Sequence, residues 1–464
     1  MREYDYDLFV IGGGSGGVRA ARLAGQLGKK VALAEEYRIG GTCVVRGCVP
    51  KKLYVYASRY HEMFEDSQGF GWAYNGISFD WKKLVAAKDK EIRRLEKIYQ
   101  SGLSAAKVEI FEDKAVFLDN HTLKLQKSNK IITADKILIA TGSTPLTNLP
   151  IEGLEHGLTT NELFNLPELP KSIVIAGGGY TAVEFANIFH GLGVNVTLVH
   201  WKDYILSSFD MDLREGLQSA MKEKNIKFAT GVTITKIDKI DSQYKVILSD
   251  GKEIKTDIVV LALGRHPYVK GLGLENTDVI LNQSGLICVD NYLKTTADNI
   301  WALGDVANHY QLTPVAIHEA MCFIQTVFHN KPTSPDYEYI ATAVFSQPEI
   351  AKVGLSEAEA ATSLLSVEIY KTSFRPMVHS LSGRNAKCFM KLVVDSNSRL
   401  IVGAHMLGEN AGEIIQLLSV ALKGKLTKEQ FDATMAVHPT ISEEFVTMYQ
   451  PNYCYVEGQK IGGC

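Results

Sequence analysis

The sequence lacks any long uninterrupted apolar run. No apolar stretch reaches the roughly 18 residues of a membrane-spanning helix. It therefore gives no reason to expect a membrane partner. It also lacks an excess of charge of either sign. The 49 Lys and Arg residues against 52 Asp and Glu leave a formal net charge of −3 at pH 7. A chain this close to neutral gives no electrostatic reason to expect a nucleic-acid partner.

Cysteine is scarce, with 7 residues in a chain of 464. An odd number at irregular spacing argues against a disulfide scaffold and favours a reducing compartment. The first residues run directly into an apolar strand without the charged and apolar regions of a signal peptide, so we expect a cytoplasmic location. Cys288, Cys322 and Cys388 lie in apolar segments and are expected to be buried as small hydrophobic residues.

Cys43 and Cys48 differ from the other cysteines, because only four residues separate them in the sequence. Two thiols in so short a segment can form a strained, easily reduced disulfide, with one sulfur attacking and the other receiving electrons. A zinc site would need a second ligand pair at metal spacing, which is absent, so no metal is expected. A purely structural disulfide is disfavoured without an export signal. The pair is therefore interpreted as redox-active.

A dinucleotide-binding pattern precedes these cysteines. A strand at Leu8–Ile11 leads into a G-x-G-x-x-G turn, a helix at about Val18–Leu27 and a second strand, Val31–Ala34, followed by Glu35. The glycines allow a tight turn, close approach of a pyrophosphate and close packing of helix on strand, while an acid at this distance can accept hydrogen bonds from a ribose. The three glycines are Gly12, Gly14 and Gly17.

The same pattern recurs later in the chain. A strand at Ser172–Ala176 precedes a G-x-G-x-x-A turn, a helix at about Thr181–Leu192 and a strand at Val196–Val199. Two such units predict two bound dinucleotides. Together with the cysteine pair, they suggest that electrons pass from a nicotinamide through a flavin into a protein disulfide.

Proline-containing linkers and a change of pattern divide the chain. Pro145 and Pro150 close the first unit, Pro167 and Pro170 precede the second, and from Ala341 strand-like and helical segments mix. We predict an α/β protein with two Rossmann-like domains and a C-terminal α+β domain. The predicted domains are 1–150, 151–267, 268–338 completing the first, and 339–464.

These motifs, in this order, resemble the pyridine nucleotide–disulfide oxidoreductase family, and within it the members that reduce glutathione disulfide. The resemblance also rests on Ala140-Thr141-Gly142, Ala262-Leu263-Gly264-Arg265, Gly304-Asp305 and His438-Pro439-Thr440-Ile441-Ser442-Glu443. It implies FAD on the first unit, NADPH on the second, and dimerisation through the C-terminal domain.

The resemblance implies a set of cofactor contacts. Glu35 would contact the adenosine ribose, Asp305 the ribityl or pyrophosphate part, and Thr313 would lie near the flavin ring. Tyr180 would cover the flavin until the nicotinamide displaces it. The remaining implied FAD contacts are Gly12, Gly14, Ser15, Gly16, Gly17, Gly41, Thr42, Ala115, Thr141 and Gly142. The implied NADPH contacts are Gly177, Gly179, His200, Lys202, Gly264 and Arg265.

The preference for NADPH rests on the end of the second strand of the second unit. NADH sites place an acid there, whereas this chain has His200. The two arginines typical of NADPH-using relatives are replaced by Trp201 and Ser207. We expect His200 and Lys202 to replace these arginines in part, and we expect discrimination between NADPH and NADH to be weaker than usual.

The resemblance also implies catalytic roles. Cys48 would face the flavin, while Cys43 would attack the substrate disulfide. His438, oriented by Glu443, would act as acid and base from the other subunit, which would make the homodimer obligatory. Lys51 and Glu184 would form an ion pair beside the flavin, although the sequence leaves Lys52 open as the partner.

Substrate recognition is expected to depend on positive charge, because glutathione disulfide carries carboxylates. Arg22 occupies the position of a carboxylate-binding arginine, Arg19 lies one turn away, and Tyr99 matches a substrate-side tyrosine. Members that reduce trypanothione carry an acid and a tryptophan on this helix face, and this chain has neither. Many relatives have an arginine where this chain has Met321, so one contact must come from elsewhere.

The sequence leaves four other functions to consider. A lipoamide dehydrogenase would carry an acid near His200, and a mercuric reductase would need a vicinal cysteine pair at its end. The nearest alternative is a large-type thioredoxin reductase with Cys454 and Cys464 on a flexible tail, although ten positions between them is an unusual spacing. A flavin-binding protein without activity is disfavoured by Cys43, Cys48 and His438 together.

Overall fold

The computed structural model describes residues 3–462 and places the first Gly-rich unit in a seven-stranded sheet. Strands β1 (Tyr6–Ile11) and β2 (Val31–Ala34) pair in parallel, with Val10 opposite Leu33, and β1 also pairs in parallel with β6 (Ile131–Ile139). The remaining strands are β3 (Glu109–Phe111), β4 (Ala115–Phe117), β5 (Thr122–Leu125) and β16 (Ile300–Ala302). Because β16 pairs with β6, a late segment of the chain completes this sheet.

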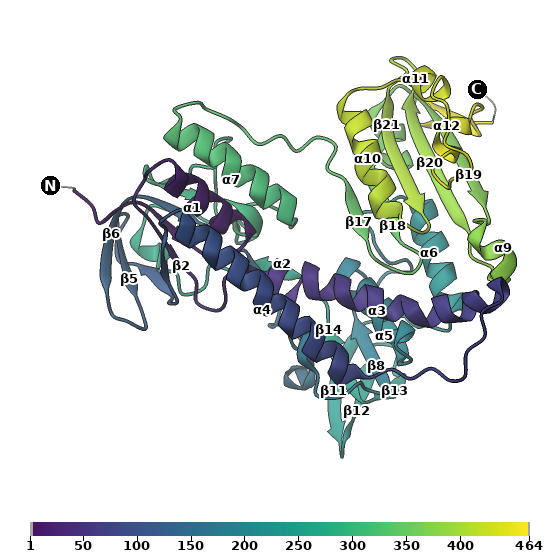
Figure 1. The fold of residues 1–464 in the computed structure, drawn as a ribbon, viewed down its shortest axis with the longest axis horizontal. Coiled ribbons are helices and arrows are strands. Elements are labelled where there is room, and N and C mark those ends of the chain that lie inside the picture. Colours follow the sequence, from purple (N-terminus) through teal and green to yellow (C-terminus); the bar gives the residue numbers. More distant parts are fainter. Residues whose placement is uncertain (1–2, 463–464) are drawn as a thin grey trace.

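Three long helices pack together around this sheet. Helix α1 (Ser15–Gln26) follows β1 directly and packs against α7 (Thr313–Phe328) and α4 (Trp81–Ala105). The buried face of α1 consists of small residues, so the helices approach each other closely. In Figure 1 this unit and α7 occupy the left of the molecule, and α4 runs from it toward the lower centre.

The second Gly-rich unit forms a smaller parallel sheet in the order β10-β9-β8-β14. Its strands are β8 (Ser172–Ala176), β9 (Asn195–His200), β10 (Lys227–Thr230) and β14 (Ile258–Leu261). An antiparallel sheet adjoins it, made of β11 (Ile234–Ile240), β12 (Gln243–Leu248) and β13 (Glu253–Thr256). Helix α5 (Tyr180–Gly191) is largely buried, which explains why most of its residues are apolar, and α6 (Met211–Glu223) follows β9.

The C-terminal region is a seven-stranded sheet in which every neighbouring pair is antiparallel. Its order is β17 (Thr342–Val344), β18 (Ile350–Gly354), β21 (Ile401–Leu407), β20 (Cys388–Asp395), β19 (Ser366–Phe374), β22 (Tyr453–Val456) and β23 (Gln459–Ile461). Helix α10 (Ala411–Lys423) packs on β18 and β21 (Figure 1). Shorter helices are α8 (Glu357–Ser363), α9 (Val378–Ser382), α11 (Lys428–Asp432) and α12 (Glu444–Thr447).

Two consecutive helices carry the cysteines into the centre of the molecule. Helix α2 (Gly41–Arg46) ends at Gly47, and α3 (Cys48–Ser67) begins immediately afterwards. Helix α3 packs against α5 of the second unit. The break at Gly47 is tight, since a Cβ there would lie 2.7 Å from the Thr42 carbonyl oxygen. The cysteines therefore lie where the two nucleotide-binding units meet (Figure 1).

A buried charge cluster joins the second unit to the C-terminal domain. The ammonium group of Lys391 on β20 lies 2.6 Å from Asp210, 2.7 Å from Asp212 and 2.7 Å from Glu357. The Lys391 side chain is only 1% exposed. Because a buried ammonium group is costly unless its charge is compensated, these carboxylates make the position of α6 against β20 specific.

The fold class is as predicted, while several details differ. Helix α1 begins at Ser15, three residues before the predicted start, because the two glycines after Ser15 adopt helical geometry and pack tightly. Cys322 and Cys388 are buried as expected, but Cys288 is only half-buried. The boundaries at 150, 267 and 338 stay predictions. Among residues 3–462, no helix is long and apolar enough to cross a membrane.

Candidate active site

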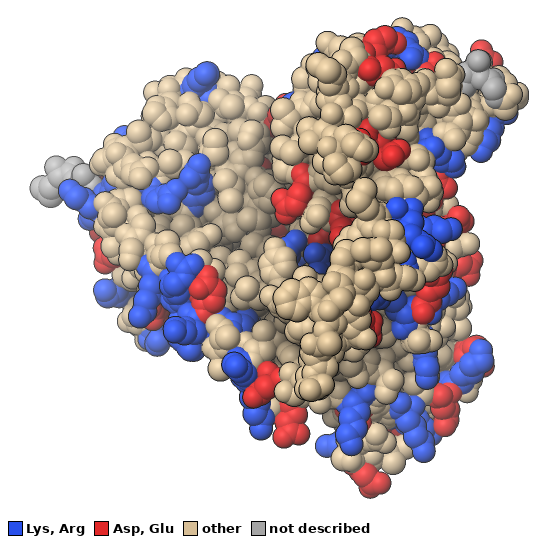
Figure 2. Space-filling model, turned by 45° about the vertical axis from the view of Figure 1, so that its right-hand side comes forward, with Lys and Arg blue, Asp and Glu red and all other residues tan. Residues whose placement is uncertain are grey.

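One large cavity, of about 1070 Å³, runs between the two Gly-rich units. It is lined by both glycine turns, by α2 and the start of α3, and by the first residues of α7. Figure 2 shows a hollow near the middle of the molecule with charged side chains inside it. Every FAD and NADPH contact implied by the resemblance lines this cavity except Gly17, which packs directly behind the turn.

The glycines of the first unit leave no room for side chains. A Cβ at Gly12 would lie 2.4 Å from the Ala140 carbonyl oxygen, and one at Gly41 would lie 2.6 Å from Gly14 Cα. Both glycines have positive φ angles, +109° and +62°. The start of α2 is thereby held directly against the turn that begins α1. This is the close backbone approach that a dinucleotide site requires, so the first unit fits FAD.

Glu35 is fixed at the end of β2 by backbone donors. Its carboxylate accepts hydrogen bonds from the N–H groups of Gly13 at 2.7 Å and Tyr37 at 2.9 Å. Burial raises the pKa of Glu35, while these N–H groups oppose the rise. The carboxylate is thus held at the cavity wall, in the position expected for a ribose contact.

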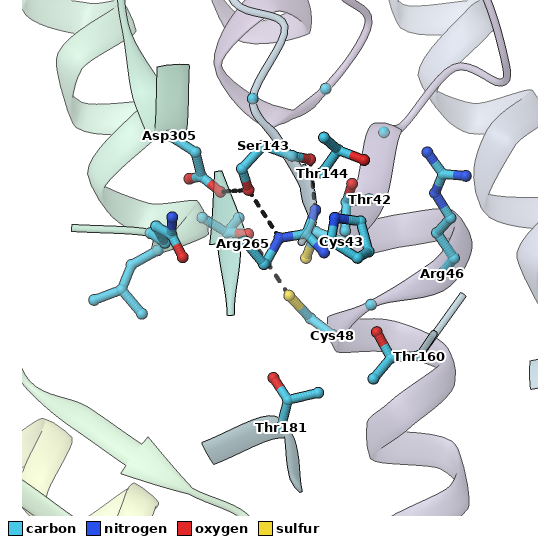
Figure 3. Close-up of a pocket in the computed structure, with 18 of the residues that line it drawn as sticks. Thr42, Cys43, Arg46, Cys48, Ser143, Thr144, Thr160, Thr181, Arg265 and Asp305 are labelled. Carbon is cyan, nitrogen blue, oxygen red and sulfur yellow. Dashed lines mark hydrogen bonds between the residues drawn. The ribbon is translucent and has the colours of Figure 1, made fainter. Parts of the chain in front are cut away.

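Asp305 belongs to a hydrogen-bonded chain that runs from Arg265 through Ser143 to Asp305. The sequence predicts Arg265 and Asp305 as site residues but not Ser143, which joins them. Ser143 donates a hydrogen bond to Asp305 at 2.7 Å, and Arg265 Nε donates to Ser143 Oγ at 2.8 Å (Figure 3). Burial raises the pKa of Asp305, and Ser143 and Arg265 oppose this rise. Ser143 was missed because a single serine after a strand carries no motif. The antiparallel pairing of β7 (Ser143–Pro145) with β15 (Arg265–Pro267) places it there.

The second unit offers less positive charge than expected. His200 ends β9 with its ring against Gly178, where a Cβ would lie 2.5 Å from the imidazole. Burial, followed by the charges of Lys202 and Arg214, lowers the pKa of His200. The imidazole is therefore neutral near pH 7, so a 2′-phosphate would depend on Lys202. That ammonium group lies 4.7 Å from the centre of the exposed Trp201 ring.

Cys43 and Cys48 are both free thiols in this structure and both line the cavity (Figure 3). Cys48 Sγ lies 3.7 Å from Thr313 Oγ1 at the start of α7. A hydrogen bond from Cys43 lowers the pKa of Cys48 to about 6, and Thr313 and Lys51 contribute further lowering. The same pairing raises the pKa of Cys43. When the pair is reduced, its proton therefore resides on Cys43 and its negative charge on Cys48.

The structure resolves which lysine pairs with Glu184. Lys51 Nζ lies 2.6 Å from Glu184 Oε1, and both side chains are largely buried. The same carboxylate oxygen accepts a hydrogen bond from the Phe345 N–H at 2.9 Å. Lys52 turns away, and its ammonium group lies 3.8 Å from Glu349. A fixed buried pair beside the thiols supports the predicted electrostatic role of Lys51.

Arg19, Arg22 and Tyr99 lie outside the cavity, where α1 meets α4 and α7. Burial raises the pKa of Tyr99, and the next contributions come from Cys43, which raises it, and Arg22, which lowers it. Both guanidinium groups keep a buried Nε without a hydrogen-bond partner among the described residues. Arg19 Nη2 contacts Met321 Sδ at 3.6 Å. Arg19 and Arg22 thus form a cationic patch, with Tyr99 at its edge toward Cys43.

His438 and Glu443 are paired but lie far from the cysteines within one chain. His438 Nδ1 is 3.0 Å from Glu443 Oε2, while the His438 side chain is 80% exposed. Neither residue lines the cavity. They belong to the segment between α11 and α12, at the upper right of Figure 1, whereas α2 lies at the centre. Two large apolar side chains beside them, Met435 and Val437, are also highly exposed.

Among the described residues, the segment that carries Cys454 is part of a sheet, whereas the alternative hypothesis places it on a flexible arm. Cys454 is buried in β22, which pairs with β19 on one side and β23 on the other. Cys464 lies outside the residues that the structure describes. Further side chains that sequence reasoning missed, Arg46, Thr144, Thr160 and Thr181, also line the cavity (Figure 3).

Comparison with known proteins defines the class of protein. Residues 6–320 match the pyridine nucleotide-disulphide oxidoreductase family, and residues 340–449 match its dimerisation domain. The chain belongs to the pyridine nucleotide–disulphide oxidoreductase family, as its sequence motifs predict.

Individual members of the family share much of their sequence or fold with this chain. The chain is 49% identical to glutathione reductase of Burkholderia cepacia, covering 97% of this chain and 99% of the relative. It is 39% identical to trypanothione reductase of Leishmania donovani, covering 98% of each. The HOCl-induced flavoprotein disulfide reductase RclA of Escherichia coli, solved as a Cu(II) complex, superposes with a TM-score of 0.85. That structure is 25% identical, covering 94% of this chain and 98% of the other.

Proposed function

We propose that this chain reduces glutathione disulfide to two molecules of glutathione, using NADPH as electron donor and FAD as bound cofactor. The observation that carries the proposal is the cationic patch beside Cys43. Arg19 and Arg22 carry charge that no carboxylate among the described residues neutralises, and an arginine pair suits a disulfide with several carboxylates. The likeness to glutathione reductases along nearly the whole chain supports the same assignment.

FAD, when bound along the first unit, supplies the relay of two electrons from a nicotinamide to the disulfide. Glu35, Asp305 and the glycine turns would hold it. Lys51 would fix the local charge beside it, because its pairing with Glu184 keeps the ammonium group in place. Tyr180, 46% exposed at the cavity wall, has room to move when the nicotinamide enters.

Cys43 and Cys48 then take different roles, because the proton of the reduced pair lies on Cys43 and the negative charge on Cys48. The Cys43 thiol transfers its proton to the imidazole of His438 of the partner subunit, and the resulting thiolate attacks one sulfur of glutathione disulfide. The substrate S–S bond breaks, a mixed disulfide forms on Cys43, and the first glutathione leaves as a thiolate. Cys48, already a thiolate, attacks the Cys43 sulfur, releases the second glutathione and re-forms the Cys43–Cys48 disulfide.

The departing thiolates need a proton donor, and we assign this role to His438 of the partner subunit. Glu443 holds Nδ1, which leaves Nε2 free to face the substrate. Within one chain this imidazole faces solvent, so it meets the cysteines only across a two-fold interface. The matched dimerisation domain supports this arrangement. We further propose a cytoplasmic role in keeping the thiol pool reduced.

The test is anaerobic turnover of glutathione disulfide with NADPH, run in parallel with NADH, trypanothione disulfide and thioredoxin. We expect fast NADPH-dependent reduction of glutathione disulfide and a preference over NADH that Lys202→Met abolishes. Cys454→Ser should leave this turnover unchanged. Flavin reduction without glutathione turnover, together with thioredoxin reduction lost in Cys454→Ser, would overturn the proposal in favour of a thioredoxin reductase.

A further inference from the structure

Arg46 lines the cavity, and among the described residues no acidic or other polar side chain pairs with its guanidinium group. It ends α2, lies between the two cysteines in sequence and lines the cavity. Among residues 3–462 it makes no hydrogen bond or ion pair, and its guanidinium carbon lies 4.6 Å from the centre of the Tyr37 ring. The ring holds the guanidinium group in place without neutralising its charge.

The other cations at this end of the cavity are already compensated. Lys51 is paired with Glu184, and Lys114 lies 3.7 Å from Glu36. Arg265 donates to the Ser143 side chain and backbone. Arg46 is therefore the cation in the described wall of the first unit whose side chain makes no hydrogen bond or ion pair. Since a half-buried, unsatisfied guanidinium group is unfavourable, its environment implies an anionic ligand.

Arg46 is close enough to Tyr268 and Arg265 to influence the pKa of both side chains. Burial raises the pKa of Tyr268, next to Glu36, and Arg46 opposes that rise. Burial also lowers the pKa of Arg265, beside Asp305, and Arg46 adds to the lowering. Arg46 lies in the same cavity as Asp305 and next to the acid end of β2, because Tyr37, whose ring it contacts, follows Glu35 by two residues. The group that joins the two halves of a dinucleotide is its diphosphate.

The geometry of α2 allows this contact. Gly41 packs against Gly14 in the turn before α1, and α2 rises about 7 Å from there to Arg46, close to the length of an arginine side chain. Figure 3 shows the Arg46 side chain extending away from Cys48, toward the side of the cavity where Thr42 lies. A guanidinium group reaching back along α2 would be able to approach phosphate oxygens held at the N-terminus of α1.

We propose that Arg46 is a phosphate-binding residue that clamps the diphosphate of FAD in the first unit. This depends on the proposed function only in taking FAD as the occupant. The guanidinium fork would donate to phosphate oxygens while its face stays on Tyr37. Neither the glycine pattern nor the acid at Glu35 implies such a clamp, because both describe backbone and ribose contacts.

The test is binding of FAD and of riboflavin, which has no phosphate, to the full-length apoprotein, followed by flavin fluorescence. Loss of a charge-assisted contact should weaken FAD binding by about 10- to 100-fold in Arg46→Met. Riboflavin binding should stay unchanged. Arg46→Lys should recover only part of the FAD affinity, because it keeps the charge but loses the guanidinium fork and its stacking on Tyr37. Arg94→Met serves as the matched control, since Arg94 is exposed and paired with Glu91 away from the cavity.

Two results would overturn the proposal. One is an FAD affinity for Arg46→Met within about twofold of the unmodified protein, which is too small for a charge-assisted contact. The other is an equal loss of FAD and riboflavin, which would mean that Arg46 acts through the fold of α2. If Arg46→Met does not accumulate, Arg46→Gln and Arg46→Lys carry the comparison. The two proposals can fail separately. If Arg46→Met weakens binding of FAD but not of riboflavin, and the unmodified protein does not reduce glutathione disulfide, the clamp is supported and the proposed function is refuted.

Discussion

At the scale of single residues, Cys48 has a pKa of about 6 because Cys43 donates a hydrogen bond to its sulfur, with help from Thr313 and Lys51. A thiol with a lowered pKa is charged above that value and becomes neutral as the pH falls through it. The reduced enzyme therefore carries a Cys48 thiolate at pH 7 and loses it below about pH 6. Activity that depends on this thiolate should decline on the acid side with the same midpoint.

We predict that Cys43→Ala raises the pKa of Cys48 toward the ordinary value of 9.0, because the largest cause of the lowering is removed. Lys51→Met should raise it by less, since that charge is a smaller contribution. The measurement is the thiolate absorbance of the reduced protein as a function of pH. An unchanged midpoint in Cys43→Ala would contradict the assignment of the shared proton to Cys43.

Prediction of single residues from the sequence is possible where a motif fixes the backbone, and it is not possible where a side chain acts alone. Glu35 and the glycines follow from spacing. Arg46 and Ser143 do not, since an arginine ending a short helix and a serine after a strand are usually solvated. Lys51 and Lys52 could not be separated by sequence, because which of two adjacent helical side chains faces α5 depends on how α3 is rotated against it.

At the scale of elements, the Lys391 cluster fixes α6 against β20 and α8. Burial opposes ionisation of Asp210, but His405 and Lys391 outweigh it, so the pKa of Asp210 is lowered. A carboxyl group with a lowered pKa stabilises the fold above its ordinary value of 3.8, and this contribution is lost as the pH falls through its folded-state pKa. The docking of these elements should therefore weaken only in strong acid.

Lys391→Met should lower the thermal midpoint markedly, at a cost of about 3–5 kcal/mol, because it leaves buried carboxylates without their cation. Lys371→Met is the control. That lysine also contacts Asp212, at 3.1 Å, but it is partly exposed, and the pair should contribute about 1 kcal/mol or less. Calorimetry of the two variants tests this, and equal losses would show that burial of Lys391 does not matter.

Element boundaries were predictable to within a few residues in the Gly-rich units, where glycine turns and apolar strands alternate. The pairing of distant strands was not. Nothing local indicates that β16 would join β6, or that β7 would pair with β15, since these contacts depend on the whole chain being folded. The same limit applies to Cys454, which reads as a tail residue in sequence but lies in a paired strand.

At the scale of the whole molecule, the proposed active site is divided between two chains. We predict that Cys43→Ser and His438→Gln variants, each nearly inactive, recover activity when their dimers are exchanged. A mixed dimer has one intact site, with Cys43 from one chain and His438 from the other. Random exchange should restore about a quarter of full activity. The measurement is turnover after subunit exchange, with each variant incubated alone as control.

Absence of recovery, although mass spectrometry confirms mixed dimers, would show that both residues act within one chain. Flavin reduction by NADPH should persist in His438→Gln, because the nicotinamide side of the cavity contains neither His438 nor Glu443.

The exposure of His438 has a consequence for the protein at low abundance. The imidazole of a lone chain faces bulk water at 80% exposure, so we expect specific activity to fall on dilution even though every chain remains folded. A cell that makes little of this protein would then have less reducing capacity than its copy number suggests. Doubling synthesis near that threshold would more than double the flux.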